Sequence, residues 1–208
     1  MLHETYRPHS FDEVSGHSRT VKMLSRLDPS GKAILLTGPS GTGKTTLARI
    51  VAATVADPLN MVELDATRLT PAKLEDCLRE SHLYAIGEKT GRAYIVNEVH
   101  GLRRDVVTQL LDGLEPIPSH ATWIFTTTID GMNQMDGIDA KPFLSRCLVF
   151  HLQPDREAFA IRAKEIAEAE GLGDAPLSEY IRLAEYCDDN LRMMLSQIET
   201  GVMLGELV

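Results

Sequence analysis

The sequence predicts an α/β protein in which a parallel sheet is covered by helices on both faces, followed by a small all-helical domain. Over the first 152 residues, short apolar runs alternate with stretches of helical spacing, as in strands joined by crossover helices. The runs are nearly continuous, which indicates strands buried on both faces. From residue 155 onward only helical patterns occur. We therefore expect one domain over residues 1–152 and a second over residues 153–208, with the boundary near residues 152–154.

Five apolar runs are expected to form the strands of the sheet. They occupy residues 32–38, 60–66, 93–96, 121–128 and 147–152. Stretches with apolar residues at helical spacing lie between and after these runs. Pro71 suits the first turn of the helix that it begins. The expected helices cover residues 44–56, 71–87 and 103–115 in the first domain, and residues 155–170, 176–187 and 190 to about 206 in the second.

The composition is that of an ordinary globular protein, with 208 residues, 43% hydrophobic and 25% charged. No apolar run approaches the ~20 residues that a membrane-spanning helix needs. The polar N-terminus lacks the apolar core of a signal peptide, so a cytoplasmic location is expected. The formal net charge of −9 argues against nucleic-acid binding through the whole surface, although it is compatible with a local basic face.

The three cysteines, Cys77, Cys147 and Cys187, lie far apart in the sequence and form no CxxC pair. This spacing favours neither a zinc site nor a disulfide framework. We expect ordinary, partly buried thiols.

A glycine-rich stretch, GPSGTGKTT, lies between the first expected strand and the first expected helix. It fits the pattern G-x-x-x-x-G-K-[ST], whose glycines let backbone N–H groups wrap phosphates at a helix N-terminus. In that pattern Lys44 reaches the β- and γ-phosphates of a nucleotide and the Thr45 hydroxyl binds Mg²⁺. The alternative is a glycine-rich turn without a ligand, which the flanking elements disfavour. The expected phosphate-binding residues are Gly38, Pro39, Ser40, Gly41, Thr42, Gly43, Lys44, Thr45 and Thr46.

The strand over residues 93–96 is followed by a second candidate group, Asn97 and Glu98. A strand beside the phosphate-loop strand should deliver one acid toward Mg²⁺ and one toward the attacking water. Glu98 suits the second task, as general base or water-orienting group. Asn97 stands where the first acid is expected, and its amide accepts a hydrogen bond without adding charge. The expected metal-side residues are Thr45, Asn97 and Glu98, unless the last two merely cap a strand.

Thr128, Arg146 and Arg192 are weaker candidates when each is taken alone. The strand over residues 121–128 ends in three threonines that suit a γ-phosphate or a water, yet such strands are ordinarily only strands. Arg146 lies in a polar break before the next strand, where a lone arginine is ordinarily a surface residue. Arg192 falls in the first turn of the last expected helix, and its alternative is an arginine whose stem packs on an apolar face.

Taken together, these motifs resemble the AAA+ ATPases of the DNA clamp loader family, both the bacterial gamma/tau subunit and the small subunits of replication factor C. The likeness runs in order through ETYRPHSFDEVSGH, the glycine-rich loop, VELDATRLT, NEVHGLRRDVVTQLLDGLEPIPSHATWIFTTT, LSRCLVFHL and DNLRMMLS. The Ser-Arg-Cys motif is the most specific part. The resemblance implies an ATPase with ATP and Mg²⁺ as cofactors, an AAA+ α/β domain over residues 1–152, and a helical lid over residues 153–208.

The resemblance also implies roles for single residues. Thr128, with Thr127 beside it, would be sensor 1. Arg146 would be an arginine finger acting on the ATP of a neighbouring subunit, and Arg192 would be sensor 2 in the lid. The implied catalytic set is therefore Lys44, Glu98, Thr128, Arg146 and Arg192. The adenine pocket would be lined by Tyr6, Arg7, Pro8, Val14 and Gly16.

Arg103 and Arg104 stand at the start of an expected helix, where clamp loaders track duplex phosphates. Adjacent arginines oppose the helix dipole slightly, so a DNA-facing role and a solvated surface pair both stay open. The main hypothesis is an oligomeric ATPase that assembles with itself or with related AAA+ subunits in a ring or spiral. It would load or remodel a DNA-bound partner, such as a sliding clamp in DNA replication, with no membrane involved.

The sequence departs from the family pattern in ways that support other hypotheses. It has no four-cysteine zinc module, no collar domain is expected after the lid, and the segment over residues 129–143 is longer than usual. Asn97 replaces the common Asp, although some replication factor C small subunits resemble this Asn-Glu form. One alternative is a nucleotide-gated matchmaker of a phage or mobile element, with little turnover. A branch-migration motor is another, but no pore-loop aromatic pattern supports it. We expect nucleotide binding, a higher Mg²⁺ requirement and slow hydrolysis.

Overall fold

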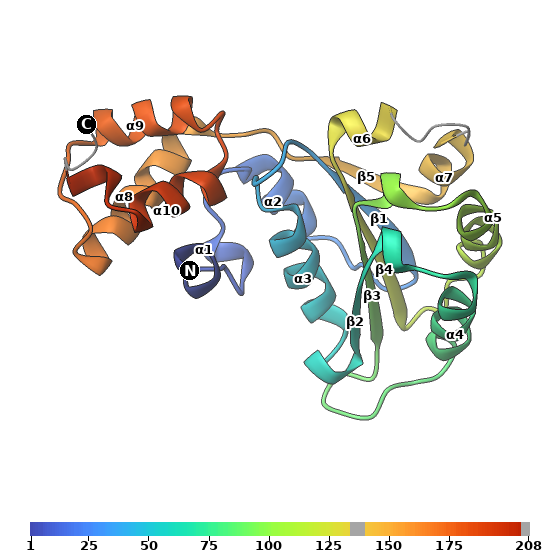
Figure 1. The fold of residues 1–208 in the computed structure, drawn as a ribbon. Coiled ribbons are helices and arrows are strands. Elements are labelled where there is room, and N and C mark those ends of the chain that lie inside the picture. The colour runs from blue at the N-terminus through green and yellow to red at the C-terminus, as the bar shows by residue number, and fades with distance from the viewer. Residues whose placement is uncertain (134–139, 205–208) are drawn as a thin grey trace. The chain divides into compact units, whose positions relative to one another are not determined.

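The structure is a computed structural model that describes residues 1–133 and 140–204 (Figure 1). The chain divides into two compact units. The sheet unit consists of Met23–Gly38 and Lys44–His151, and the helical unit consists of Met1–Lys22, Pro39–Gly43 and the chain from Leu152 onward. Within the described residues, no helix is long and apolar enough to cross a membrane.

The sheet has five parallel strands in the order β2-β3-β4-β1-β5. The strands are β1 (Lys32–Thr37), β2 (Met61–Asp65), β3 (Arg92–Asn97), β4 (Ala121–Thr127) and β5 (Cys147–His151). All five lie within about two residues of the predicted runs. The three central strands are buried nearly throughout, whereas the edge strands β2 and β5 are only partly covered. The predicted α/β class with a parallel sheet is confirmed.

Alternation along the central strands sends side chains to two covered faces. One face carries Tyr94 and Trp123, whose rings stack with centroids 4.5 Å apart, in a core shared with α4 (Pro71–Ser81), α5 (Arg104–Gly113) and α7 (Ala140–Arg146). The other face lies against α3 (Lys44–Val55). Figure 1 shows α3 on one side of the sheet and α4 with α5 on the other.

Some helices differ from the predicted ones. Helix α4 stops at Ser81 rather than residue 87, because its following backbone groups find partners outside the helix. Arg92 Nε donates to the carbonyl of Leu83 over 2.8 Å, and Ala85 N donates to the carbonyl of Thr90 over 2.9 Å. The segment between β4 and β5, for which the sequence predicts no helix, holds α6 (Ile129–Asn133) and α7. Arg146 therefore ends a helix instead of standing in a break.

The helical unit is built on α8 (Arg156–Glu170), α9 (Leu177–Tyr186) and α10 (Leu191–Glu199). Asp155 caps α8 and Asn190 caps α10, since each side chain accepts from a backbone N–H three residues on. Helix α10 ends at Glu199, before Gly201 with its positive φ of 91°, so the predicted helix to about residue 206 is too long. Residues 205 and 206 lie outside the described part.

The N-terminal segment packs with these helices. Helix α1 (Leu2–Thr5) contacts α10, and Leu2 belongs to the same buried cluster as Phe159 and Tyr180. Helix α2 (Ser18–Leu24) spans the point in the chain where the helical unit passes into the sheet unit. The short 3-10 turns are Phe11–Glu13, Pro58–Asn60, Ala66–Arg68, Val99–Gly101 and Val202–Leu204. The expected domain boundary near residue 152 stays a prediction.

Candidate nucleotide site

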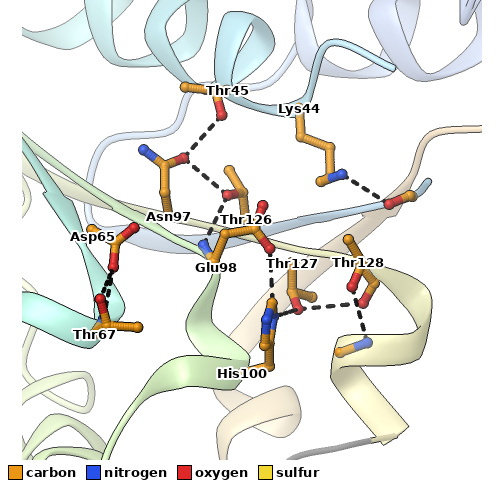
Figure 2. Close-up of polar contacts among 12 residues, drawn as sticks. Lys44, Thr45, Asp65, Thr67, Asn97, Glu98, His100, Thr126, Thr127 and Thr128 are labelled. Atoms are coloured by element: carbon orange, nitrogen blue, oxygen red, sulfur yellow. Dashed lines mark hydrogen bonds and ion pairs between the residues drawn. The ribbon is translucent and has the colours of Figure 1, made fainter. Parts of the chain in front are cut away.

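Lys44 begins α3 directly after the glycine-rich loop, and its side chain is only 6% exposed. Its ammonium donates to the carbonyl of Gly38 over 2.9 Å (Figure 2). A buried ammonium is costly unless it is paired. A cation held at the turn between a buried strand and a helix N-terminus suits a phosphate ligand, in keeping with the predicted role.

The rest of the phosphate loop, Pro39–Gly43, belongs to the helical unit. Thr42 Oγ1 donates to the carbonyl of Pro39 over 2.9 Å, which closes a turn in the loop. Gly41 and Gly43 have positive φ angles of 73° and 95°, a conformation that glycine adopts without a steric cost. A β-carbon added at Gly43 would meet no atom of the described residues within 4 Å, so the loop has room on that side.

Asn97, at the end of β3, holds three hydrogen bonds through its amide. Its Oδ1 accepts from Thr45 Oγ1 over 3.1 Å and from Thr126 Oγ1 over 2.9 Å. Its Nδ2 donates to Glu63 Oε1 over 2.9 Å. Figure 2 shows Thr45 and Thr126 pointing to the same amide oxygen from α3 and β4. Asn97 is therefore directed at the predicted Mg²⁺ ligand Thr45.

Glu98 follows Asn97 in a left-handed backbone conformation, with φ 55° and ψ 53°. Non-glycine residues rarely adopt this conformation, and such outliers cluster at functional sites. The Glu98 backbone N–H donates to Thr126 Oγ1 over 3.3 Å, so one buried hydroxyl contacts both Asn97 and Glu98. The Glu98 carboxylate Oε2 lies 3.4 Å from His100 Nδ1.

The side chains of Thr126, Thr127 and Thr128, at the end of β4 and directly after it, form hydrogen bonds with different partners. Thr126 contacts Asn97, and Thr127 Oγ1 lies 3.2 Å from His100 Nδ1. Thr128 Oγ1 accepts from Gly131 N over 3.0 Å at the start of α6. That bond leaves the Thr128 hydroxyl proton available to donate, so the proposed sensor role of Thr128 is compatible with its capping role.

The residues near the end of β3 suit a magnesium ion. Thr45 offers a hydroxyl, Asn97 an amide oxygen and Glu98 a carboxylate, and Mg²⁺ prefers such oxygen ligands together with phosphate and water. Among the described residues, no three His, Cys, Asp or Glu side chains are grouped to hold a metal. The donor set thus fits an ion shared with nucleotide phosphates better than an ion held by protein alone.

The two predicted γ-phosphate arginines lie in different units. Arg146 forms an ion pair with Glu115 through Nη2 and donates from Nη1 to the carbonyl of Pro142 over 3.0 Å, while its buried Nε has no hydrogen-bond partner within residues 1–133 and 140–204. Arg192 lies in the first turn of α10, as predicted, and is exposed.

The predicted adenine-side residues lie in the N-terminal segment of the helical unit. Tyr6 donates its hydroxyl to Glu170 Oε1 over 2.6 Å, and this hydrogen bond raises the pKa of Tyr6. Gly16 has φ 71° and lies close to Asp155 and Phe159, which leave little room for a side chain. Arg7, Pro8 and Val14 are partly buried.

The two predicted DNA-contacting arginines, Arg103 and Arg104, are exposed at the start of α5. Arg103 Nε lies 3.7 Å from the carboxylate of Asp105. Their exposure fits either of the roles left open by the sequence.

Three residues were missed by sequence reasoning: Glu63, His100 and His17. His17 Nε2 lies 2.8 Å from the carbonyl oxygen of Thr42 in the phosphate loop. The sequence holds a signal for His100, which comes two residues after Glu98. Glu63 could be found only once the strand order was known.

The parallel sheet and the phosphate loop define a nucleotide-binding protein of the P-loop class. Within that class, the chain matches the model of the AAA family, the ATPase family associated with various cellular activities, over residues 34–151. This match covers more than half of the chain, so the chain belongs to the AAA family. The expected ATPase class is confirmed at the level of the family.

Curated relatives support the resemblance found in the sequence. The chain is 27% identical to DNA polymerase III subunit tau of Escherichia coli (strain K12) and to subunit gamma of Buchnera aphidicola subsp. Acyrthosiphon pisum, over 99% of its length in both cases. It covers only 35% of that tau subunit and 62% of that gamma subunit. The relationship to gamma/tau subunits is confirmed, whereas the activities and partners of those longer proteins are not transferred by it.

Solved structures resemble the fold. The Thermotoga maritima RuvB Holliday junction branch migration motor aligns with a TM-score of 0.69 at 21% identity, over 93% of this chain and 64% of that one. A mutant of the same protein aligns with a TM-score of 0.73 at 20% identity, over 94% of this chain and 65% of that one. At such low sequence identities, the similarity shows only that the folds are alike.

Proposed function

We propose that this chain is an ATP-binding and ATP-hydrolysing subunit that assembles with copies of itself or with related AAA+ subunits. It loads or remodels a DNA-bound partner, such as a sliding clamp in DNA replication. The observation that carries the proposal is the hydrogen bond from Thr45 to Asn97, with Lys44 and Glu98 next to them in the sequence, in a chain related to polymerase III gamma and tau subunits.

In this proposal each residue of the sheet unit has a separate task. Lys44 binds the β- and γ-phosphates, and Thr45 together with Asn97 supports Mg²⁺, which would neutralise phosphate charge. Glu98 orients the attacking water or takes its proton. Thr126 holds Asn97 and Glu98 in one arrangement because its hydroxyl bonds to both.

Assembly would complete the catalytic set. Arg146 stabilises the transition-state charge on the nucleotide of a neighbouring subunit, and Arg192 keeps its expected role as sensor 2. An arginine supplied in trans is worth orders of magnitude in rate, and it acts only when subunits meet. Hydrolysis is thereby coupled to assembly.

Two surface features support a DNA-bound partner. Arg103 and Arg104 present two adjacent guanidinium groups at the start of α5, suited to phosphate oxygens. Large apolar side chains are exposed on two segments joined by a hydrogen bond from Asn60 Nδ2 to the carbonyl of Ile86. They are Leu59, Leu83, Tyr84 and Ile86, of which Leu59 and Ile86 are 98% and 97% exposed. Grouped apolar exposure of this kind is typical of a protein-binding surface.

The ATPase rate with and without primed DNA tests the proposal, with wild type, Arg146→Ala and Arg79→Ala compared. Arg79 is an exposed arginine paired with Asp76 on α4 and serves as the matched control. We expect DNA to stimulate turnover, Arg146→Ala to reduce it by at least ~100-fold, and Arg79→Ala to leave it unchanged. Unchanged turnover in Arg146→Ala would refute the finger role.

Light scattering tests the assembly step. We expect a larger particle with a slowly hydrolysed ATP analogue than with ADP. A monomer with either nucleotide, at all protein concentrations at which turnover is measured, would rule out shared sites.

A second candidate function is a nucleotide-gated matchmaker with little turnover, for which ATP is a structural ligand. The amide of Asn97 favours it, because it supplies no charge to the metal side of the site. The two functions differ in one measurement. A matchmaker would assemble with ATP and recruit its partner at an undiminished level when Glu98 is changed to Gln, whereas a loader would assemble but fail to cycle.

A further inference from the structure

The Asn97 amide belongs to a closed set of side chains on α3, β2 and β3. Thr45 and Arg49 are spaced four residues apart, so they lie on the same face of α3. Thr45 donates to Asn97, Asn97 donates to Glu63 on β2, and Glu63 accepts from Arg49. The register explains this set, because Glu63 pairs with Ile95 and thus lies on the same face of the sheet as Asn97.

Glu63 is held in place by two hydrogen bonds from Arg49. Arg49 Nε lies 2.6 Å from Glu63 Oε2, and Arg49 Nη2 lies 3.1 Å from Glu63 Oε1. Glu63 Oε1 also accepts from Asn97 Nδ2 over 2.9 Å. Two-pronged Arg–carboxylate pairs fix geometry as well as charge. The carboxylate that faces Asn97 is therefore oriented and partly neutralised.

This arrangement decides which way the Asn97 amide points. If the amide were reversed, its oxygen would face the Glu63 carboxylate, which has no proton to donate. The hydroxyls of Thr45 and Thr126 accept either orientation, since a hydroxyl both donates and accepts. Among the described partners of Asn97, Glu63 makes this choice, and it turns the Asn97 oxygen toward Thr45.

We propose that Glu63, held by Arg49, is a positioning residue that keeps the Asn97 amide oxygen turned toward the metal side of the site. The inference rests on the proposed ATP site. It also implies that Asn97 and Glu63 form a matched pair. An aspartate at position 97 would place two carboxylates against each other, where the Asn97 amide now donates a hydrogen bond to Glu63. Restoring the acid at position 97 alone would therefore create a conflict, and the acid would need a neutral partner at position 63.

A double-mutant cycle of Asn97→Asp and Glu63→Gln tests the pairing. In the double variant, the new amide at position 63 donates from its nitrogen to the new carboxylate at position 97 and accepts from Arg49 Nε through its oxygen, and it gives up only the bond from Arg49 Nη2 to the shared oxygen. Each single variant leaves a mismatch of its own. In Asn97→Asp two carboxylates meet. In Glu63→Gln the new amide nitrogen must face either Asn97 Nδ2 or a nitrogen of Arg49, and all of these groups are hydrogen-bond donors. We expect each single variant to melt below wild type without nucleotide or metal, and the double variant to lose less than the two single variants together.

The readout specific to positioning is the Mg²⁺ enhancement of binding, defined as the affinity for a fluorescent ATP analogue in excess Mg²⁺ divided by that in EDTA. Loss of a side chain that orients a metal ligand typically lowers metal affinity ~10-fold or more. We expect Glu63→Ala and Glu63→Gln to lower the enhancement by about that factor while affinity in EDTA stays unchanged. The double variant should regain it, and Asp76→Asn, which removes a carboxylate from the exposed Arg79 pair on α4, should not alter it.

The outcomes separate the two proposals. If wild type does not bind the analogue at all, the proposed ATP site is wrong. If wild type binds it with Mg²⁺ enhancement, and both Glu63 variants keep that enhancement, the ATP site stands and the positioning role of Glu63 is wrong. Additive effects of Asn97→Asp and Glu63→Gln would likewise contradict the pairing.

Discussion

The ring of His17 lies against the phosphate loop, with Nε2 2.8 Å from the carbonyl oxygen of Thr42. His17 is 8% exposed, and Phe159 of α8 packs on it edge-to-face with ring centroids 5.5 Å apart. Burial lowers the pKa of His17, and the hydrogen bond to Thr42 and the nearby Asp155 oppose that shift. The neutral ring thus joins the N-terminal segment, the phosphate loop and α8 within the helical unit.

The stability of the protein should fall on acidification because of His17. The unfolded chain takes up this proton near pH 6.5, whereas the folded chain takes it up only at lower pH. The contribution of the neutral ring is therefore complete above pH ~6.5 and is lost as the pH falls toward the folded pKa, with a slope of at most ~1.4 kcal/mol per pH unit. Urea unfolding of wild type and His17→Gln from neutral to acidic pH should show a shallower pH dependence in the variant.

His9 provides the control for this experiment, since it is an exposed histidine of the same N-terminal segment. His9→Gln should leave the pH dependence of unfolding as in wild type. Equal slopes for wild type and His17→Gln would mean that His17 is not the group that titrates.

Glu115 should restrain the proposed arginine finger. Arg146 pairs with Glu115 of its own chain, and it must leave this partner to reach a neighbouring subunit. Exposed pairs are worth up to ~1 kcal/mol, so Glu115→Gln should lower the protein concentration for half-maximal ATPase activity by up to ~5-fold. A protein titration of ATPase activity measures this shift, and Glu115→Gln combined with Arg146→Ala should be as inactive as Arg146→Ala. Lower activity in Glu115→Gln would instead mean that Glu115 positions the finger.

The strands could be predicted from the sequence because burial on both faces demands continuous apolar runs, such as those ending at Thr37 and Thr127. The end of α4 could not. Its apolar spacing continues into Leu83 and Tyr84, yet the backbone there bonds to Arg92 and Thr90, which lie beyond the next turn. Local periodicity carries no information on such partners, so a prediction from spacing extends the helix to residue 87.

The same distinction applies to the site. Lys44, Thr45 and Glu98 could be predicted because each role depends on local sequence, a glycine-rich loop or a strand end. Glu63 has no such signal, since its contact with Asn97 depends on β2 lying beside β3 in a particular register. Glu115 is similar: it lies 31 residues from Arg146 and meets it only through the fold.

Lys44 should account for the nucleotide-dependent part of stability. A ligand at 100 times its dissociation constant stabilises a protein by ~2.7 kcal/mol. Lys44→Ala should lose most of this gain because it removes the buried ammonium that is proposed to bind the β- and γ-phosphates. Thermal melts with and without an ATP analogue check the effect. The control is Lys32→Ala, which removes a lysine that bonds the carbonyl of Asp28 outside the loop and should keep the full shift.

Gly41 should be intolerant of a side chain for two separable reasons. Its φ of 73° lies in the left-handed region, which costs alanine roughly 1 kcal/mol. A β-carbon there would also lie 1.7 Å from Asn190 Oδ1, the atom that caps α10 by accepting from Met193 N over 3.1 Å. Gly41→Ala must therefore displace the cap, which costs a further ~1 kcal/mol. Gly171, with φ 67° and no atom of the described residues within 4 Å of an added β-carbon, should show the backbone cost alone.

Urea unfolding of four variants separates these two costs. Gly171→Ala should lose roughly 1 kcal/mol and Gly41→Ala about twice that. Asn190→Gly should lose only a few tenths of a kcal/mol, since glycine is an acceptable cap, and it removes the obstacle to a β-carbon at position 41. Gly41→Ala combined with Asn190→Gly should therefore lose less than Gly41→Ala alone plus Asn190→Gly alone. Strict additivity would mean that the cap of α10 does not contact the phosphate loop.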